Sequence, residues 1–232
     1  MFPGWLHQCA LAMLVLGGAC AIGIGIAVMR RPERMAIMNV VWPVCALFGS
    51  VLVVLAYWQL ATPADAKASR GKPPFPAVVA KGALHCGSGC TLGDLAAEWL
   101  AFAAPVTATW FGWHWLFAEK TFAVWVLDFL FAFLLGIVFQ YFAIVPMRGL
   151  SFREGVVAAL KADTLSLAAW QVGMYGGMAL LQFGLFRHAY GHIAAVDTPE
   201  FWFAMQLAML AGFATAYPVN WWLIRSGLKE AM

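Results

Sequence analysis

Long apolar runs alternate along the chain with short segments that contain charges or prolines. Six runs approach or exceed the length of about 20 mostly apolar residues that a helix needs to cross a bilayer. They cover residues 9–29, 39–60, 77–102, 121–145, 153–186 and 199–224. The pattern therefore predicts an all-α fold, a polytopic membrane helix bundle of about six transmembrane helices.

The chain is expected to divide into three parts. Residues 1–62 hold two N-terminal transmembrane helices, and residues 77–232 hold a four-helix membrane core. Between them, residues 63–76 form a proline-rich linker with Lys67, Arg70 and Lys72. No Lys or Arg precedes the first apolar run and no clear cleavage site follows it, so we expect a retained helix and not a signal peptide.

The composition argues against a soluble domain. The hydrophobic share is 63% and the charged share 11%, whereas soluble domains have about 45–50% and about 25%. No basic and aromatic stripe suggests nucleic acid. We expect a bacterial inner-membrane protein whose partners are the lipid bilayer, a metal ion, and either further copies of the chain or another membrane subunit.

The basic residues favour a cytoplasmic position for both termini. With six crossings, nine Lys and Arg side chains face the cytoplasm and five face the other side. This agrees with the usual excess of positive charge in cytoplasmic loops. The basic cluster at residues 30–34 falls on the other side and argues against the arrangement.

One apolar segment carries an unusual set of reactive side chains, His85, Cys86, Cys90, Asp94 and Glu98. The last four are spaced by four residues, and each such step advances about 40° around a helix. Cys86, Cys90 and Asp94 therefore share one face, with Glu98 at its edge. Ionisable groups at membrane depth are by default functional candidates.

The acidic residues determine which way this face points. An acid at the centre of a spanning helix costs about 2.5–3.5 kcal/mol on insertion scales. Asp94 and Glu98 should therefore face the bundle interior, and Asp128 in the fourth apolar run needs a partner or a proton. Asp163 lies near a helix start, where it can pair with Lys161. Glu98, Asp128 and Asp163 are candidates for proton relay or ion coordination, and hydrogen bonding for helix register is the structural alternative.

Methionine pairs extend the set of soft ligands. Met174 and Met178 are four residues apart, as are Met205 and Met209. Thioethers and thiolates select Cu(I) in particular, while imidazole also suits zinc. With His85 at the mouth and Cys86, Cys90 and Asp94 behind it, the expected metal is copper first and zinc second. Ordinary packing of methionine remains the alternative.

Two further residue groups have weaker functional signals. His188 and His192 are four apart, which on one helix face would form an entry site for a metal ion, or else a polar turn at the interface. Cys9, Cys20 and Cys45 are isolated in apolar runs, where free cysteine usually fills core space.

Two other functions compete with copper transport or sequestration. A thiol–quinone oxidoreductase would cycle Cys86 and Cys90 and take a quinone as cofactor. Side chains four apart on a regular helix are about 5–6 Å apart at Cβ, whereas a disulfide needs about 3.5–4.5 Å. A proton-coupled carrier of a small solute would depend on the carboxylates instead. No nucleotide-binding loop and no HExxH motif indicates an enzyme.

Several separated motifs are similar to those of a known family. HCGSGCTLGD, AEWL, GIVFQYFAIVPMRG, KADTLSL and YPVNWWLI…KEAM resemble an uncharacterised prokaryotic membrane family catalogued as domain of unknown function 4396. The resemblance covers residues 85–232, with a weaker echo at residues 39–43. It implies a four-helix membrane core preceded by a more variable pair of helices, and it carries no activity.

Overall fold

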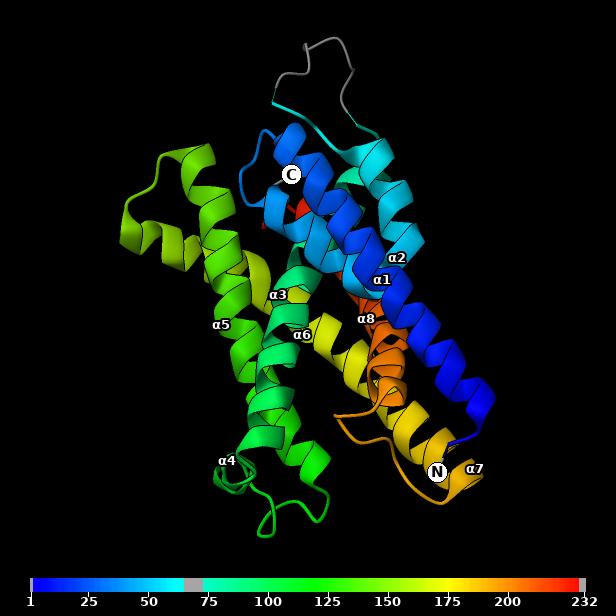
Figure 1. The fold of residues 1–232 in the computed structure, drawn as a ribbon. Coiled ribbons are helices and arrows are strands. Elements are labelled where there is room, and N and C mark those ends of the chain that lie inside the picture. Colours follow the sequence, from blue (N-terminus) through cyan, green and yellow to red (C-terminus); the bar gives the residue numbers. More distant parts are fainter. Residues whose placement is uncertain (1, 65–72, 230–232) are drawn as a thin grey trace.

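The computed structural model describes residues 2–64 and 73–229, which fold into a bundle of helices (Figure 1). The six long elements are α1 (Gly4–Arg30), α2 (Met38–Leu60), α3 (Phe75–Ala103), α5 (Lys120–Arg148), α6 (Phe152–Ala179) and α8 (Pro199–Arg225). Three short elements connect them: α4 (Val106–Trp110), the π-helix η1 (Leu180–Phe186) and α7 (Arg187–Tyr190). The predicted all-α bundle is confirmed, while most of the predicted linker at 63–76 lies outside the described residues.

Local signals explain where the helices begin and end. Pro74 precedes α3, Pro76 occupies its first turn, and the helix ends at Ala103 shortly before Pro105. Gly149 ends α5 with a φ of 62°, a left-handed conformation that glycine adopts without a steric penalty. Ser151 and Glu154 form a capping box that starts α6. Such signals hold the observed ends close to the predicted ones.

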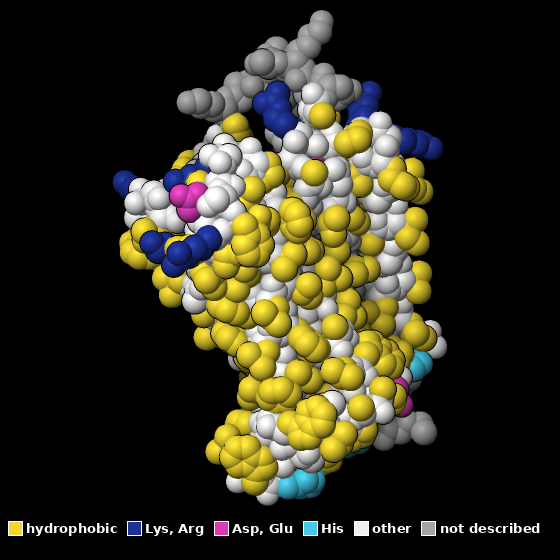
Figure 2. Space-filling view, turned by 90° about the vertical axis from the view of Figure 1, so that its left-hand side faces the viewer, with side chains coloured by type: hydrophobic (Ala, Val, Ile, Leu, Met, Phe, Trp, Pro, Cys, Tyr) yellow, Lys and Arg dark blue, Asp and Glu magenta, His cyan; other side chains and the backbone are white. Residues whose placement is uncertain are grey.

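The chain is a membrane protein by the character of its helices. By length and composition α1, α2, α5 and α8 are apolar enough to cross a membrane. Apolar side chains cover the middle of the molecule in Figure 2, and Lys and Arg gather toward one end. The other two long helices, α3 and α6, carry nine of the 19 buried polar or charged side chains of the described residues, and α3 contacts α2, α5, α6 and α8. The bundle thus has a polar interior within an apolar surface.

The second long element is a hairpin of two half-helices and does not cross the bundle. Its direction reverses at Ser50, whose φ of 43° and ψ of −122° are not helical. The rings of Trp42 and Tyr57 lie 5.6 Å apart, although 15 residues of straight helix would separate them by about 22 Å. Figure 1 shows the two arms side by side, with both ends at the same end of the bundle.

A buried carboxylate fastens the two ends of this hairpin to each other. Glu33 accepts a hydrogen bond from Trp42 Nε1 at 2.8 Å and two from the backbone and hydroxyl of Thr62, both at 2.9 Å. Lys81 Nζ of α3 lies 3.9 Å from the same carboxylate. The expectation that residues 39–60 form a spanning helix is therefore wrong. Length and composition suffice for a crossing, but Glu33 holds both ends at one side.

The hairpin leaves five long helices that run from end to end of the bundle: α1, α3, α5, α6 and α8. The two termini accordingly lie at opposite ends of the bundle (Figure 1), whereas the sequence analysis expected both on the cytoplasmic side. Among the described residues, every Lys and Arg except Lys120 and Arg187 lies at or near the end where α1 finishes. The basic cluster at residues 30–34 now joins the majority, so the conflict in the sequence-based charge count disappears.

The hairpin predicts which loops share a compartment. We expect Ala36→Cys and Ala64→Cys, both at exposed positions, to react with a membrane-impermeant maleimide from the same side, because Ala64 N donates to Pro32 O at 2.8 Å. Each variant would be made in a background without the native cysteines. Asp197→Cys, in the loop before α8, should react only from the other side. Labelling of positions 36 and 64 from opposite sides would contradict the hairpin and show that residues 39–60 cross the membrane.

Candidate functional site

Close packing of two helices brings the ionisable side chains together. A Cβ on Gly89 would lie 2.9 Å from Gly136 Cα, and one on Gly93 would collide with the backbone of Ala132. Small residues at these positions let α3 and α5 approach closely. Asp128 on α5 is thereby placed beside the polar face of α3.

Three carboxyl groups form a buried cluster, which we call the carboxyl cluster: Asp94, Glu98 and Asp128. Their exposed fractions are 1%, 4% and 0%. Asp128 interacts electrostatically with both others, and Asp94 does so with Glu98. Neither Asp94 nor Asp128 has a hydrogen-bond partner for its carboxyl oxygens within the described part of the chain. Such an arrangement is costly unless protons, water or a cation occupy it.

Helix α6 adds two neutral side chains to the carboxyl cluster. Gln171 is 1% exposed and lies near Asp94, although no hydrogen bond of normal geometry joins them. Tyr175 interacts with all three carboxyls, donates its hydroxyl to the Trp125 carbonyl at 2.8 Å and stacks on that indole. Sequence reasoning missed Tyr175. The sequence signal was that Tyr175 lies four residues after Gln171 and twelve after Asp163, which places all three near one face of the same helix.

One end of the carboxyl cluster reaches a hollow near the surface. Glu98 and Lys120 line this hollow of about 210 Å³, together with residues 193–196. Lys120 Nζ donates to the Ala101 carbonyl at 2.7 Å and interacts electrostatically with Glu98. Glu98 therefore connects the interior to the end of the bundle at which α5 begins.

A buried ion pair lies toward the opposite end. Lys229 Nζ is 3.3 Å from Asp163 Oδ1, 3.4 Å from Ser166 Oγ and 3.5 Å from the Gly82 carbonyl. Asn220 Nδ2 donates to Ser166 Oγ at 2.7 Å. The predicted local pair of Asp163 with Lys161 is wrong, because Asp163 faces the interior and is paired with the residue that follows α8.

The cysteines of the motif lie between this ion pair and the carboxyl cluster. Cys86 and Cys90 are both fully buried and interact with each other, and Cys86 also interacts with Asp163. Cys45 of α2 interacts with Cys86 and donates its thiol to the Leu84 carbonyl at 3.1 Å. All five cysteines are free thiols. Cys45, which the sequence assigned to core filling, is thus a neighbour of the motif.

His85 does not lie at a mouth, as the sequence analysis expected. It is completely buried and packs edge-on against Phe139 at a centroid distance of 6.2 Å. Neither ring nitrogen has a hydrogen-bond partner among residues 2–64 and 73–229. Its place in the helix, one residue before Cys86, turns it toward α5 and away from the surface.

The methionines divide between two places. Met174 and Met178 are fully buried in the apolar core, whereas Met205 and Met209 line a pocket beside Asp94. Met209 Sδ accepts a hydrogen bond from Trp170 Nε1 at 3.4 Å. In the described ranges, no three His, Cys, Asp or Glu side chains are arranged to hold a metal ion. The residues expected to form one metal path therefore belong to separate environments.

His188 and His192 do not share a helix face. Helix α7 ends at Tyr190, and Gly191 follows in a left-handed conformation with a φ of 78°. His188 is exposed, while the His192 ring packs on Phe2 at 4.5 Å. The break at Gly191 removes the regular spacing on which the expected entry site rested.

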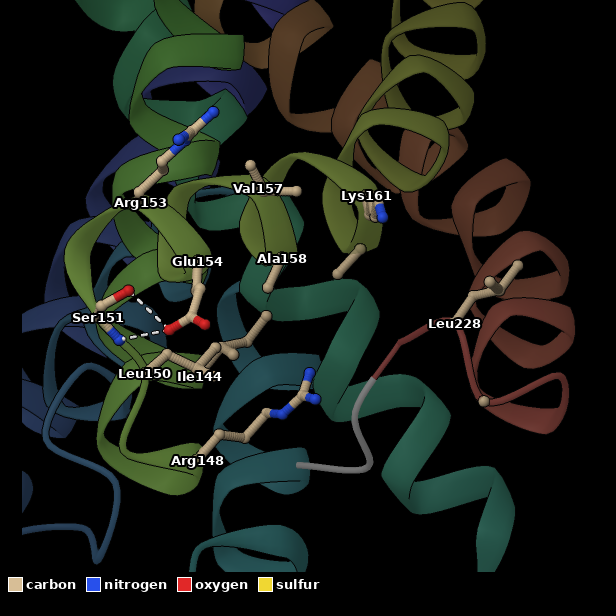
Figure 3. A pocket seen from close by; sticks show the side chains of 12 residues that line it. Ile144, Arg148, Leu150, Ser151, Arg153, Glu154, Val157, Ala158, Lys161 and Leu228 are labelled. Carbon is tan, nitrogen blue, oxygen red and sulfur yellow. Dashed lines mark hydrogen bonds between the residues drawn. The ribbon is translucent and has the colours of Figure 1, made fainter.

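Two larger hollows flank these groups. The pocket beside Asp94 has a volume of about 310 Å³ and is bordered by α1, α2, α3 and α8. A basic hollow of about 730 Å³, shown in Figure 3, lies between the end of α5, the start of α6 and residues 227–228. Arg148, Arg153 and Lys161 line it. Hydrogen bonds from the Ser151 hydroxyl and backbone lower the pKa of the exposed Glu154 carboxyl there.

Comparison with known proteins agrees with the similarity of the motifs. The family model described as Domain of unknown function (DUF4396) matches residues 77–229, which run from the third residue of α3 through the end of α8. Searches of curated proteins and of solved structures gave no match. Every member of the carboxyl cluster lies within the matched region.

The ion pair of Lys229 and Asp163 predicts a double-mutant result. Lys229→Met should lower the free energy of unfolding by about 3 kcal/mol, because it leaves a buried carboxylate without its partner. Lys229→Met combined with Asp163→Asn should recover most of this loss. The measurement is unfolding of the purified protein in mixed micelles. Additive losses in the double variant would show that the two side chains do not depend on each other.

Proposed function

The chain belongs to the DUF4396 family, and we propose that it is a proton-coupled carrier of a small solute. The carboxyl cluster is the essential part, and Asp94, Glu98 and Asp128 exchange protons as solute binds and leaves. One observation carries the proposal: three carboxyls from two helices are buried together, and the oxygens of Asp94 and Asp128 lack hydrogen-bond partners in the described residues.

The energy of burial supports this proposal over a purely structural role. A structural polar network is expected to be fully hydrogen-bonded, because a half-satisfied network is worse than an apolar core. Three carboxylates that interact in a medium of low dielectric constant cannot all remain charged. Protons or a bound cation must therefore accompany them, and exchange of one for the other is the elementary step of a proton-coupled carrier.

The positions of the carboxyls supply a route. Glu98 lines the hollow beside Lys120, and Asp94, one helical turn away, lines the pocket on the other side of α3. Protons would enter or leave through Glu98, and solute would occupy the Asp94 pocket. Because most Lys and Arg among the described residues lie at the other end of the bundle, we expect from the positive-inside rule that the Glu98 hollow opens on the side away from the cytoplasm.

The proposal predicts different effects for the carboxyls and the thiols. In proteoliposomes that enclose a pH dye and a mixture of small organic solutes, solute-dependent proton uptake should fall about 100-fold in Asp128→Asn, since a proton-relay group contributes rate factors of this order. Cys86→Ala/Cys90→Ala should keep the wild-type rate. Asp197→Asn, which changes an exposed carboxyl, serves as the control. Equal uptake in Asp128→Asn and the wild type would refute the carrier.

Handling of a soft metal ion, copper first and zinc second, is the second candidate. One observation favours it: Cys86 and Cys90 interact with each other, and the Cys45 thiol interacts with Cys86. Thiolates are soft ligands of the kind that Cu(I) prefers, although these three thiols are not gathered into a metal site within the described ranges, so a bound ion would have to draw them together. The same thiols would serve a thiol–quinone oxidoreductase, but all three are completely buried, so a quinone would have no direct access to them.

Metal analysis separates this candidate from the carrier. If copper is handled at the thiols, protein purified after growth with copper should contain bound metal that is lost in Cys86→Ser/Cys90→Ser and reduced in Cys45→Ser. Cys9→Ser, at an exposed cysteine, is the matched control. Negligible copper and zinc in both the wild type and the double variant would exclude the metal function.

A further inference from the structure

The pocket beside Asp94 has the features of a ligand site with a defined chemistry. Its volume of about 310 Å³ lies at the lower end of the range of small-molecule pockets. Asp94 lines it, is 1% exposed, and has no hydrogen-bond partner for either carboxyl oxygen in the described chain. A buried and unpartnered carboxyl in a cavity calls for a ligand that donates hydrogen bonds or carries positive charge.

The other polar groups of the pocket also present acceptors. Gln206 Nε2 donates to the carbonyls of Leu47 at 2.7 Å and Met13 at 3.4 Å, while Oε1 has no partner among the described residues. Thr91 Oγ1 donates its proton to the Gly87 carbonyl at 2.7 Å, so the lone pairs of this hydroxyl oxygen remain available to accept a hydrogen bond. None of the residues that line the pocket is Lys, Arg or His. The pocket therefore offers hydrogen-bond acceptors to a ligand and no cationic side chain.

The tip of the α2 hairpin adds to this preference. The first half-helix ends at Gly49 and Ser50, and Leu47 and Phe48 from its last turn line the pocket. The last carbonyls of a helix lack intrahelical partners and carry the negative end of the helix dipole. Because the end of this broken helix borders the pocket, the negative end of its dipole favours a cation there.

The remaining walls are apolar and aromatic. Trp99 and Trp202 stack at a centroid distance of 6.0 Å, and Met205, Met209 and Leu95 complete the surface. Trp99 is 45% exposed on the apolar face of the bundle, so the rim of the pocket lies where lipid contacts the protein. Indole rings attract cations over their faces, and a ligand reaching this rim through lipid must itself be largely apolar.

From these contacts we infer that the pocket binds a lipophilic primary amine as its ammonium ion, with Asp94 as counter-ion. This inference rests on the proposed function and names the substrate class of the same site. Binding converts the Asp94 carboxylic acid and the ammonium ion into a carboxylate–ammonium pair and one released proton.

The released proton has a route through the groups around Asp94. The groups that face Asp94 are Glu98 and Cys90 on its own helix, Asp128 of α5, and Gln171 and Tyr175 of α6. Glu98 can take this proton to the hollow beside Lys120.

The test uses the full chain in nanodiscs with 2-phenylethylamine as the probe. Equilibrium dialysis should show saturable binding of one amine per chain and at least about tenfold weaker binding of the neutral 2-phenylethanol, because a buried acid left without its cation loses a charged hydrogen bond. In weakly buffered solution, about one proton should be released for each amine bound. Asp94→Asn should abolish both signals. Equal binding of the amine and the alcohol would overturn the inference and point instead to a neutral ligand such as a quinone.

A second variant keeps the test valid if Asp94→Asn fails to fold. Gly18 of α1 borders the pocket, and a Cβ at this position meets no atom within 4 Å. Gly18→Leu should therefore fill the pocket and block amine binding without strain. Gly25→Leu, also open on the same helix but outside the pocket, is the matched control and should bind normally. Normal amine binding in Gly18→Leu would place the ligand elsewhere.

The outcomes separate this inference from the proposed carrier. Proton uptake that depends on Asp128, without amine binding, would retain the carrier and reject the amine as its substrate class. Amine binding that depends on Asp94, without any proton uptake in proteoliposomes, would retain the site and reject the carrier.

Discussion

The arrangement of the whole molecule depends on the carboxylate of Glu33. It accepts hydrogen bonds from Trp42 at one end of α2 and from Thr62 at the other, with Lys81 of α3 close by. Without that attachment, the second apolar run is long enough to cross the membrane, and every later helix would run in the opposite direction. A buried carboxylate with this many partners is satisfied, unlike those of the carboxyl cluster. Glu33 therefore has a structural role, whereas the unsatisfied acids are the residues to which we assign the proposed chemistry.

Hydropathy was sufficient to predict the helices but not the path of α2. The long runs gave nearly correct ends because length, prolines and capping residues act locally. A re-entrant pair of half-helices has the same composition as one spanning helix, so periodicity cannot distinguish them. The deciding features were Ser50, an ordinary residue in a conformation that normally needs glycine, and Glu33, which reads as a loop residue. In the sequence analysis, the basic cluster at residues 30–34 fell on the side opposite to most other basic residues, and this conflict was the one sign that residues 39–60 do not cross the membrane.

For the candidate site, the sequence likewise predicted what depends on one helix and missed what depends on contacts between helices. The fourfold spacing placed Cys86, Cys90 and Asp94 on one buried face, since helix geometry fixes which residues of α3 share a side. The side chains that contact this region come from elsewhere in the chain. In the sequence, Tyr175 looks like an ordinary aromatic residue of a helix and Lys229 like a charged residue of a loop. Only tertiary packing brings both into the interior. His85 was misplaced for a related reason, because its own face of the helix is turned to α5.

The proposed proton-exchanging acids and the walls of the proposed solute pocket come from different parts of the chain. Asp94, Glu98 and Asp128 lie inside the family-matched region, whereas the tip of the hairpin and the α1 wall of the Asp94 pocket come from residues that precede it. A change in the first 62 residues can therefore reshape the chamber without touching the acids that would exchange protons. If the proposed carrier function holds, chains that keep the core but carry different N-terminal helices would share one energy source and select different cargo.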